Sequence, residues 1–369
     1  MPSLVALDLP GGPEFVDELR RAWERGDAVL PVDQRLPAPA KERLLESMRP
    51  DSVVDAQGDH RRAFGRPTEE GDALVVATSG STGDPKGVVL THSAVEASAR
   101  ASSRALEVDS SDHWLACLPM AHIGGLSVVT RSLITGVPVT VIPTFAAEEV
   151  TRLAHRCTLT ALVGTALARI DPRLYRAILL GGGRPPENRP PNTVATYGLT
   201  ETGSGVVYDG WPLDGVEVSI AEDGEILLRG PMLMRCYRDG TTVIDADGWL
   251  HTDDLGHLQH DGRLHVEGRR GDVIVTGGQK VWPEAVERVL APFITGQDFC
   301  IIGIPDPQWG DRVVLATTDA SLSLDRIRGH VKEALPAYCA PQEIVVVPRI
   351  ERTALGKVQR TEMRKLLKP

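Results

Sequence analysis

From Trp114 to Ala195, short apolar runs alternate with helical segments, and further segments of both kinds precede them. Hydrophobic side chains recur at helical spacing in Pro13–Arg25, Lys41–Met48 and His92–Leu106, whereas residues 67–72 are polar and predict a loop. The runs that predict buried strands are Ala73–Ala77, Trp114–Leu118, Val139–Ile142, Ala161–Val163, Ala177–Leu180 and Val194–Ala195. Such alternation is typical of helices packed on a parallel sheet.

The pattern changes after Gly210. Up to Leu264, strand-like segments are separated by Asp-Gly pairs at 223–224, 239–240, 247–248 and 261–262. Asp-Gly favours the tight turns of β-hairpins because glycine tolerates positive φ. A β-rich part is therefore predicted over residues 210–265.

A smaller unit is predicted from Asp272 onward. Its expected elements are a helix at Pro283–Leu290, strands at Phe299–Ile304 and Val313–Thr317, a helix at Leu324–Ala334 and a strand at Glu343–Val347. The sequence thus predicts a multidomain α/β protein. It comprises a large N-terminal α/β lobe with parallel sheets and a β-rich part (1–268), a hinge (269–271) and a small, mobile C-terminal α+β domain (272–369).

Length and charge narrow the class of protein. A chain of 369 residues exceeds the size at which one hydrophobic core stops growing. Its net charge of −10 disfavours a nucleic-acid partner. We expect no membrane insertion and a cytoplasmic location, because no apolar stretch reaches the roughly 18 residues of a spanning helix and the N-terminus lacks a signal-like core. Five scattered cysteines without C-x-x-C spacing predict neither disulfides nor a zinc site.

The run TSGSTGDPKG, from Thr78 to Gly87, is the strongest single signal for chemistry. Backbone N–H groups of a Ser/Thr/Gly-rich loop can converge on a polyphosphate. Pro85 before Lys86 and Gly87 after it exclude a Walker A loop, which requires G-K-[ST]. We also expect the helix at 92–106 to direct its N-terminus at this loop. A surface turn is the alternative reading of so short a segment.

Four further segments carry groups suited to a nucleotide. Residues 178–183 predict a strand that ends in a glycine turn, where a flat ring could lie against backbone, and residues 196–202 supply an aromatic ring, hydroxyls and the carboxylate of Glu201. Acidic acceptors follow at Asp253 and Asp254, and a single lysine, Lys357, follows Gly356 near the C-terminus. Taken singly, each of these residues also has a structural interpretation. Tyr197 would be a packing residue, the two aspartates would cap a turn, and His122 would be a core histidine whose hydrogen bonds are satisfied.

Together these motifs resemble the adenylate-forming superfamily of acyl-CoA synthetases, adenylation domains and luciferases. The matching segments, in order, are TSGSTGDPKG, YGLTET, GWLHTDDLG, GRRGDVIVTGGQKVWPEAVE and RTALGKVQR, and the resemblance covers residue 73 to the C-terminus. Within the superfamily, LPMAHIGGLSVVTRSL and GSGVVYDGWPLDGVEV are most similar to o-succinylbenzoate-CoA ligases of menaquinone synthesis.

The resemblance implies an ATP-dependent acid–thiol ligase that uses ATP, Mg²⁺ and coenzyme A. A carboxylate attacks the α-phosphorus of MgATP, and the coenzyme A thiol then displaces AMP after the small domain turns. Lys357 would stabilise the charge of the first step, Thr200 would contact the α-phosphate, and Glu201 would bind Mg²⁺. The implied phosphate-binding residues are Thr78, Ser79, Gly80, Ser81, Thr82, Gly83 and Lys86.

The same resemblance implies the remaining contacts. Adenine would lie between Gly182-Gly183 and Tyr197, while Asp254 and Arg269 would bind the ribose. His122 and Gly198 would border the acyl substrate. Arg131 is either an exposed helix residue or a residue whose guanidinium binds a substrate carboxylate. The match to the family's arginine favours the second interpretation and hence an aromatic dicarboxylate as the substrate.

Three departures from the family pattern leave questions open. Gly271 stands where many relatives carry a hinge aspartate, and Asp253 replaces the usual glycine beside the ribose-binding aspartate. Residues 1–77 form a shorter N-terminal part than in most relatives, so a homodimer that covers an exposed edge is one expectation. Transfer of the acyl group to a carrier protein, another aryl or acyl substrate, and a catalytically inactive nucleotide-binding regulator are the alternative functions.

Overall fold

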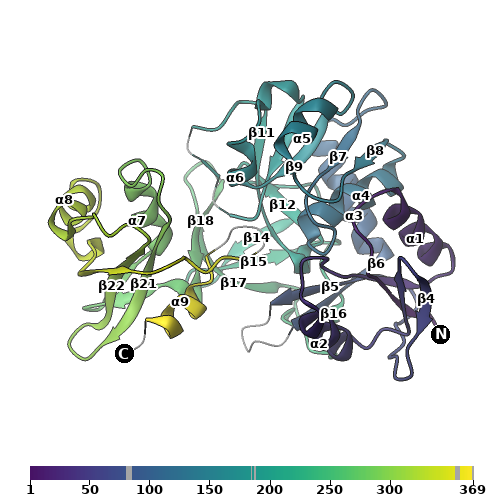
Figure 1. The fold of residues 1–369 in the computed structure, drawn as a ribbon, viewed down its shortest axis with the longest axis horizontal. Coiled ribbons are helices and arrows are strands. Elements are labelled where there is room, and N and C mark those ends of the chain that lie inside the picture. The colour runs from purple at the N-terminus through teal and green to yellow at the C-terminus, as the bar shows by residue number, and fades with distance from the viewer. Residues whose placement is uncertain (80–84, 184, 187, 354–357, 368–369) are drawn as a thin grey trace. The chain divides into compact units, whose positions relative to one another are not determined.

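The computed structural model describes residues 1–79, 85–183, 185–186, 188–353 and 358–367 (Figure 1). The chain forms two compact units. The first comprises residues 1–219 and 227–252, and the second comprises 220–226 and 253–369. No described helix is long and apolar enough to cross a membrane.

A seven-stranded sheet opens the first unit. Its strands, in spatial order, are β16 (Cys236–Tyr237), β6 (Pro85–Thr91), β5 (Asp72–Ser79), β2 (Ala28–Pro31), β1 (Leu4–Leu7), β3 (Ser52–Asp55) and β4 (Gly58–Arg61). The four central strands are parallel, and the outer strands pair antiparallel. Helices α1 (Pro13–Glu24) and α2 (Ala38–Met48) precede β2 and β3. Phe15 and Leu19 lie four residues apart on α1 and are both fully buried, as an amphipathic helix requires.

The second sheet carries most of the strands expected from the sequence. Its order is β13 (Trp211–Pro212), β12 (Ser204–Tyr208), β11 (Thr193–Leu199), β10 (Ala177–Leu180), β9 (Leu159–Leu162), β7 (Trp114–Ala116) and β8 (Val139–Val141). The strands from β8 to β11 are parallel, and β12 turns back antiparallel. The helices of this region are α3 (His92–Ala105), α4 (Ile123–Thr135), α5 (Ala147–Leu153) and α6 (Gly164–Leu167).

The β-rich segment predicted after residue 210 is present. It contains β14 (Glu217–Ile220), β15 (Glu225–Arg229), β17 (Leu250–Leu258) and β18 (Leu264–Arg269). Gly224 and Gly262 have φ of 91° and 90°, which explains the Asp-Gly signal at these two turns. The chain passes between the two units within β17 and around the β14–β15 turn.

The C-terminal part of the second unit is a sheet with helices on both faces. It comprises β19 (Ile274–Thr276), β20 (Gln279–Val281), β21 (Phe299–Asp306), β22 (Gly310–Thr317), β23 (Glu343–Val346), α7 (Pro283–Leu290), α8 (Leu324–Ala334) and α9 (Arg360–Leu366). Alternate residues of β21 enter different cores: Ile301 packs with α7 and α8, whereas Ile302 packs with Met363 of α9. The multidomain α/β fold class is confirmed, while the hinge at 269–271 stays a prediction.

Candidate active site

The predicted phosphate loop connects the two strands of a hairpin. In β5 and β6, Thr78 lies opposite Lys86 and Ser79 lies opposite Pro85. The Thr78 hydroxyl donates to the carbonyl oxygen of Lys86 at 3.4 Å. Gly80, Ser81, Thr82 and Gly83 lie outside the described residues. The hairpin therefore holds Thr78 and Lys86 side by side where residues 80–84 begin and end.

The expectation that a helix N-terminus directs its dipole at this loop is wrong. The seven residues of β6 separate the loop from α3, which begins at His92, beyond the far end of the strand. Thr91 caps α3 instead, because its hydroxyl accepts a hydrogen bond from the Ala94 amide at 3.2 Å. Among the described residues of the hairpin, Lys86 therefore provides the positive charge that could bind an anion.

Tyr237 joins Lys86 to Glu201. The Lys86 ammonium lies 5.1 Å from the centre of the Tyr237 ring, and the Tyr237 hydroxyl donates to Glu201 Oε1 at 2.8 Å. The Met234 amide donates to the Glu201 carbonyl oxygen at 2.7 Å and fixes the backbone there. Tyr237 thus holds a cation over its ring and a carboxylate at its hydroxyl. Such a pair is suited to bind a phosphate chain and its magnesium ion.

The glycine turn and the tyrosine predicted to hold adenine are neighbours. Parallel strands β10 and β11 pair Leu180 with Ala195, so the turn at Gly182 and Gly183 lies level with Tyr197. Gly182 has φ of 77°. Gly198 follows at a bulge in β11, and a Cβ there would stand 2.2 Å from the Ser204 carbonyl oxygen. Glycine is therefore required at position 198.

Thr200 begins a single 3-10 turn, Thr200–Thr202, directly after β11. Thr202 closes this turn, because its hydroxyl donates to the Ser204 carbonyl oxygen at 2.7 Å and accepts from the Leu199 amide at 2.9 Å. This turn positions Thr200 and Glu201 next to the bulge at Gly198. The structure therefore brings the 196–202 motif together as one local site.

The predicted ribose-binding pair lies in the second unit. Asp254 and Arg269 are opposite each other in the β17–β18 pair, with Oδ1 and Nη1 3.5 Å apart. Asp254 is 8% exposed. Its neighbour Asp253 has φ of 58°, a left-handed conformation that glycine adopts at least cost. The family's usual glycine at this position is explained by that backbone.

His122 directly precedes α4, and two residues that were not predicted from the sequence contact it. The Arg35 Nη2 atom lies 2.9 Å from His122 Nε2, and Asp33 Oδ2 lies 3.6 Å from the same nitrogen. Burial and then the charge of Arg35 lower the pKa of His122, while Asp33 opposes that shift. His122 therefore remains neutral to lower pH than an ordinary histidine. No motif signals Asp33 or Arg35, because they lie 87 or more residues upstream.

Arg131 is buried, so the alternative of an exposed helix residue is wrong. It is 2% exposed; its Nε donates to the Ser102 hydroxyl at 2.7 Å, and its Nη1 donates to the Ser127 hydroxyl at 3.3 Å. The guanidinium also lies 5.6 Å from the centre of the Trp114 ring. Within the described chain it makes no ion pair with a carboxylate. A buried guanidinium of this kind gains strongly from an added carboxylate.

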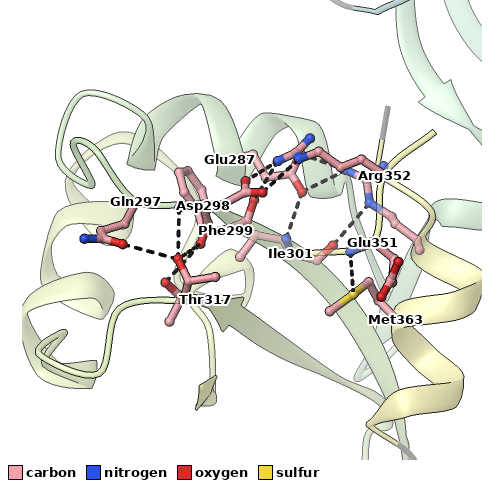
Figure 2. Close-up of polar contacts among 11 residues, drawn as sticks. Glu287, Gln297, Asp298, Phe299, Ile301, Thr317, Glu351, Arg352 and Met363 are labelled. Carbon is pink, nitrogen blue, oxygen red and sulfur yellow. Dashed lines mark hydrogen bonds and ion pairs between the residues drawn. The ribbon is translucent and has the colours of Figure 1, made fainter. Parts of the chain in front are cut away.

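Lys357 lies outside the described residues, but the segments on each side of it are paired. Arg352 forms a β-bridge with Val358, and the Gln359 amide donates to the Glu351 carbonyl oxygen at 2.8 Å. Figure 2 shows Arg352 beside Asp298, the residue that precedes β21. The Arg352 Nε atom donates to Asp298 Oδ2 at 3.0 Å.

Gly271 is exposed within the turn Arg270–Asp272, and nothing lies within 4 Å of where its Cβ would be. Its φ is not positive. The space around it would admit the hinge aspartate of relatives, so this position does not require glycine sterically. The hinge role of Gly271 stays a prediction.

All five cysteines are free thiols. Burial raises the pKa of Cys117 to about 11, which makes it unsuited to nucleophilic chemistry at neutral pH. In the described part of the chain, no cluster of three or more His, Cys, Asp or Glu could hold a metal ion. A magnesium ion here would rely on Glu201 and on the phosphates themselves, which is its usual mode beside nucleotides.

Two family comparisons match these regions. Residues 14–238 match the family of AMP-binding enzymes, and residues 285–357 match the C-terminal domain of that family. The chain belongs to the AMP-binding enzyme family. The family resemblance that the motifs indicate is thereby confirmed.

Several curated AMP-binding enzymes are similar along most of the chain. The 2-succinylbenzoate–CoA ligase of Listeria monocytogenes is 33% identical over 79% of this chain and 69% of its own length. A probable 2-succinylbenzoate–CoA ligase of Mycobacterium tuberculosis is 36% identical over 88% of this chain and 93% of its own length. The latter is therefore similar in length to this chain.

Solved AMP-binding enzymes share the fold. The o-succinylbenzoate CoA synthetase of Bacillus subtilis, in complex with its acyl-adenylate intermediate, is 27% identical with a TM-score of 0.86, covering 98% of this chain and 88% of that one. The ATP-bound MatB of Rhodopseudomonas palustris has a TM-score of 0.84 at 20% identity over 99% of this chain and 89% of that one, which shows likeness of fold alone.

Proposed function

We propose that this chain is an ATP-dependent ligase that joins 2-succinylbenzoate to coenzyme A through an acyl-adenylate. The observation that carries the proposal is the placement of Lys86, Tyr237 and Glu201 beside the β5–β6 hairpin, in an AMP-binding enzyme whose curated relatives are 2-succinylbenzoate–CoA ligases. The solved relatives named for complexes with an acyl-adenylate, or with ATP and magnesium ion, support ATP as the co-substrate.

Two half-reactions account for the product. In the first, a carboxylate oxygen of the acid attacks the α-phosphorus of ATP, the bond to the bridging oxygen breaks and pyrophosphate leaves. In the second, the coenzyme A sulfur attacks the acyl carbon, AMP leaves and the thiol proton is released. Magnesium, held by Glu201 and the phosphates, would neutralise phosphate charge. Negative charge grows on the phosphate oxygens in the first step, so cations placed beside them lower its barrier.

Different residues are proposed to bind the phosphates, the adenine and the ribose of the nucleotide. Lys86 and the hairpin residues from Thr78 to Gly83 would hold the β- and γ-phosphates, and Thr200 would contact the α-phosphate. Gly182, Gly183 and Tyr197 would hold adenine, and Asp254 with Arg269 would hold the ribose. Lys357 would supply the cation of the adenylation step. The local structure supports three of these assignments: Thr78 lies opposite Lys86, the parallel strands β10 and β11 pair just before Gly182 and Tyr197, and Thr200 and Glu201 share one 3-10 turn.

The acyl substrate is proposed to lie beside His122 and Gly198, with its second carboxylate at Arg131. The burial of Arg131 without a carboxylate partner among the described residues supports a dicarboxylic acid. Small-molecule acids are therefore the expected partners. A cytoplasmic location and a homodimer complete the proposal; the free thiols suit a reducing compartment, and sedimentation of the purified chain would decide the oligomeric state.

A panel of carboxylic acids with ATP, Mg²⁺ and coenzyme A tests the function. Pyrophosphate release and the mass of the thioester are measured for 2-succinylbenzoate, benzoate and aliphatic diacids. Preference for 2-succinylbenzoate with formation of its thioester supports the proposal. Preference for benzoate-type monoacids would reassign the substrate, and pyrophosphate release without consumption of free coenzyme A would favour loading of a carrier protein. No turnover of any acid would favour a nucleotide-binding regulator.

A further inference from the structure

The segment that follows β2 reaches the ring of His122. Asp8 holds this segment in place, because it accepts hydrogen bonds from Gln34 Nε2 at 2.5 Å and from Lys41 Nζ at 2.6 Å. The loop carrying Asp33 and Arg35 is therefore fixed to the end of β1 and to the start of α2. This connection belongs wholly to the first unit.

Arg35 is oriented by Asp33. The Arg35 amide donates to Asp33 Oδ1 at 3.0 Å, Nε donates to Oδ1 at 2.8 Å, and Nη2 donates to Oδ2 at 2.7 Å. Asp33 is mostly buried, with a side chain 14% exposed. Burial opposes its ionisation, but the hydrogen bonds from Arg35 outweigh that effect and lower the pKa of Asp33. The carboxylate therefore stays charged and keeps the guanidinium aligned.

The same guanidinium determines which ring nitrogen of His122 carries the proton. A guanidinium has N–H donors and no acceptor, so at 2.9 Å from Arg35 Nη2 the His122 Nε2 atom must accept. The ring proton then resides on Nδ1. The backbone of His122 is also fixed, because its N–H donates to the Pro119 carbonyl oxygen at 3.1 Å and its carbonyl oxygen accepts from the Leu126 amide at 3.0 Å.

We propose that Arg35 is a positioning residue that holds His122 as the neutral tautomer protonated on Nδ1, with that N–H as the ring's donor toward the acyl substrate. A neutral donor orients a carboxylate without forming an ion pair, so the carboxylate keeps its nucleophilicity. The placement of the substrate beside His122 rests on the proposed function, whereas the tautomer rests on the contact between Arg35 and His122.

Arg173 offers a matched comparison within the same unit. Its amide and Nε donate to Asp171 Oδ1 at 3.1 and 2.9 Å, and its Nη2 donates to Asp171 Oδ2 at 2.8 Å. These are the bonds that Arg35 makes with Asp33, at the same spacing of two residues. In the described structure the Arg173 guanidinium contacts no histidine. Arg173→Ala therefore removes an equivalent Asp–Arg pair without touching His122.

Nitrogen NMR of the histidine-labelled full-length protein tests the tautomer directly, with the His122 signals identified by their loss in His122→Asn. We expect Nδ1 of the wild type to show the shift of a protonated nitrogen and Nε2 that of an unprotonated one. In Arg35→Ala the donor to Nε2 is lost and Asp33 remains, so the proton should move to Nε2 or be shared by both nitrogens. Arg173→Ala should resemble the wild type. A wild-type His122 protonated on Nε2 would overturn the proposal.

The pH profile of kcat/KM provides the functional readout. Asp33 and Arg35 are the charged groups whose fields shift the titration of His122. Removal of the Arg35 charge should move that titration upward in pH, so Arg35→Ala should lose activity at a higher pH than the wild type, with a loss that approaches about tenfold per pH unit below the ring's pKa. Arg35→Lys should restore part of the profile, because it retains a cationic donor.

The controls separate failure of the inference from failure of the function. A profile of Arg35→Ala that coincides with that of Arg173→Ala would overturn the positioning role, provided both variants unfold at temperatures close to that of the wild type. If Arg35→Ala does not fold, Arg35→Gln, which also removes the charge, serves in its place. If the wild type forms no acyl-CoA at all, the proposed function falls, and the NMR result alone decides the tautomer.

Discussion

Asp253 is one of the non-glycine residues with positive φ in the described chain, together with Arg49, Glu107 and Asp209. An L-residue in this region of φ and ψ places its Cβ near the backbone, at a cost of roughly 1–2 kcal/mol that is smaller for Asp and Asn. The sequence revealed that aspartate stands where relatives have glycine. The reason for their glycine could not be read from the sequence, because it lies in the backbone dihedral.

Asp253→Gly should stabilise the protein by about 0.5 kcal/mol, since relief of the left-handed strain exceeds the entropy that glycine adds to the unfolded chain. The exposed contact between Asp253 and Arg270, at 3.5 Å, contributes little. Urea denaturation measures the difference. Asp253→Ala is the control, because it removes the carboxylate but keeps the strain, and it should be no more stable than the wild type. A less stable glycine variant would contradict the strain argument.

At Arg131, sequence similarity indicated a role, and the structure adds the burial that makes the role testable. Arg131→Ala should raise KM for 2-succinylbenzoate by at least about tenfold, which corresponds to one lost hydrogen bond to a charged group. The KM for a monoacid should change much less. Steady-state kinetics of both acids with one enzyme sample cancels any loss of folded protein. Equal changes for the two acids would assign Arg131 to the packing of α3 against α4.

Among the elements, the β5–β6 hairpin could be predicted only in part. Ala73–Ala77 signalled a buried strand, but KGVVL was not recognised as its partner, so the helix at His92 was placed too close to the loop. Strands β1, β2 and β3 were missed as well. Each has four residues, too few for a period to be recognised, and each is stabilised by pairing with distant strands.

Tyr237 lies on β16 and reaches Glu201 only because β16 pairs with β6, so no local motif marks it. Tyr237→Phe keeps the ring beneath Lys86 but removes the hydrogen bond to Glu201. We expect KM for MgATP to rise roughly tenfold, as for loss of one hydrogen bond to a charged group. Initial rates over a range of Mg²⁺ and ATP concentrations measure this effect. Tyr175→Phe, which loses the bond from its hydroxyl to Val150 O, should lower stability without changing that KM.

The helix α9 is held by a buried charge cluster. Arg360 is 4% exposed and contacts Glu287 at 2.7 Å, Glu284 at 2.9 Å and Asp272 at 3.4 Å. Burial raises the pKa of Glu287, and Arg360 opposes that rise. Figure 2 shows that Glu287 also accepts the amide of Ile301. The ion pairs therefore connect α9 to α7, and the hydrogen bond from Ile301 joins β21 to the same cluster.

Arg360→Met should destabilise the second unit by about 3–5 kcal/mol, because it leaves buried carboxylates without a partner. Hydrogen exchange of β21 amides such as Ile301 in the full-length protein reports on this unit. Addition of Glu287→Gln should recover part of the loss. Arg349→Ala is the control: its pair with Glu351 is exposed, so exchange should remain as in the wild type. Unchanged protection in Arg360→Met would contradict the stabilising role of the cluster.

For the molecule as a whole, the sequence was sufficient for the class of fold and for the order of its motifs. It was sufficient because each motif is local: Gly182 with Gly183, or Tyr197 with Glu201, is read within a few residues. The contacts between motifs were not predictable in this way. Tyr237 reaches Lys86 through the pairing of β16 with β6, and Arg35 reaches His122 from a loop 87 residues upstream. A single sequence contains no signal for contacts over such separations.

The proposed role of Lys357 in the first half-reaction leads to a prediction. Lys357→Ala should nearly abolish formation of the acyl-adenylate, because a cation beside the reacting phosphate is worth several kcal/mol. Thioester formation from supplied acyl-adenylate should largely survive. Pyrophosphate release and thioester yield, measured separately, test both statements. Lys365→Ala, which removes a surface lysine paired with Glu362, is the control. Equal loss of both half-reactions would argue against the role.

The last helix is also bonded to a segment far upstream. Arg364 Nη1 donates to the main-chain carbonyl oxygen of Gly271 at 3.1 Å, and Arg360 contacts Asp272, so α9 is attached to the residues at which the small domain is expected to turn. Proteolytic trimming of the final ten residues would thus relax a turn some ninety positions earlier.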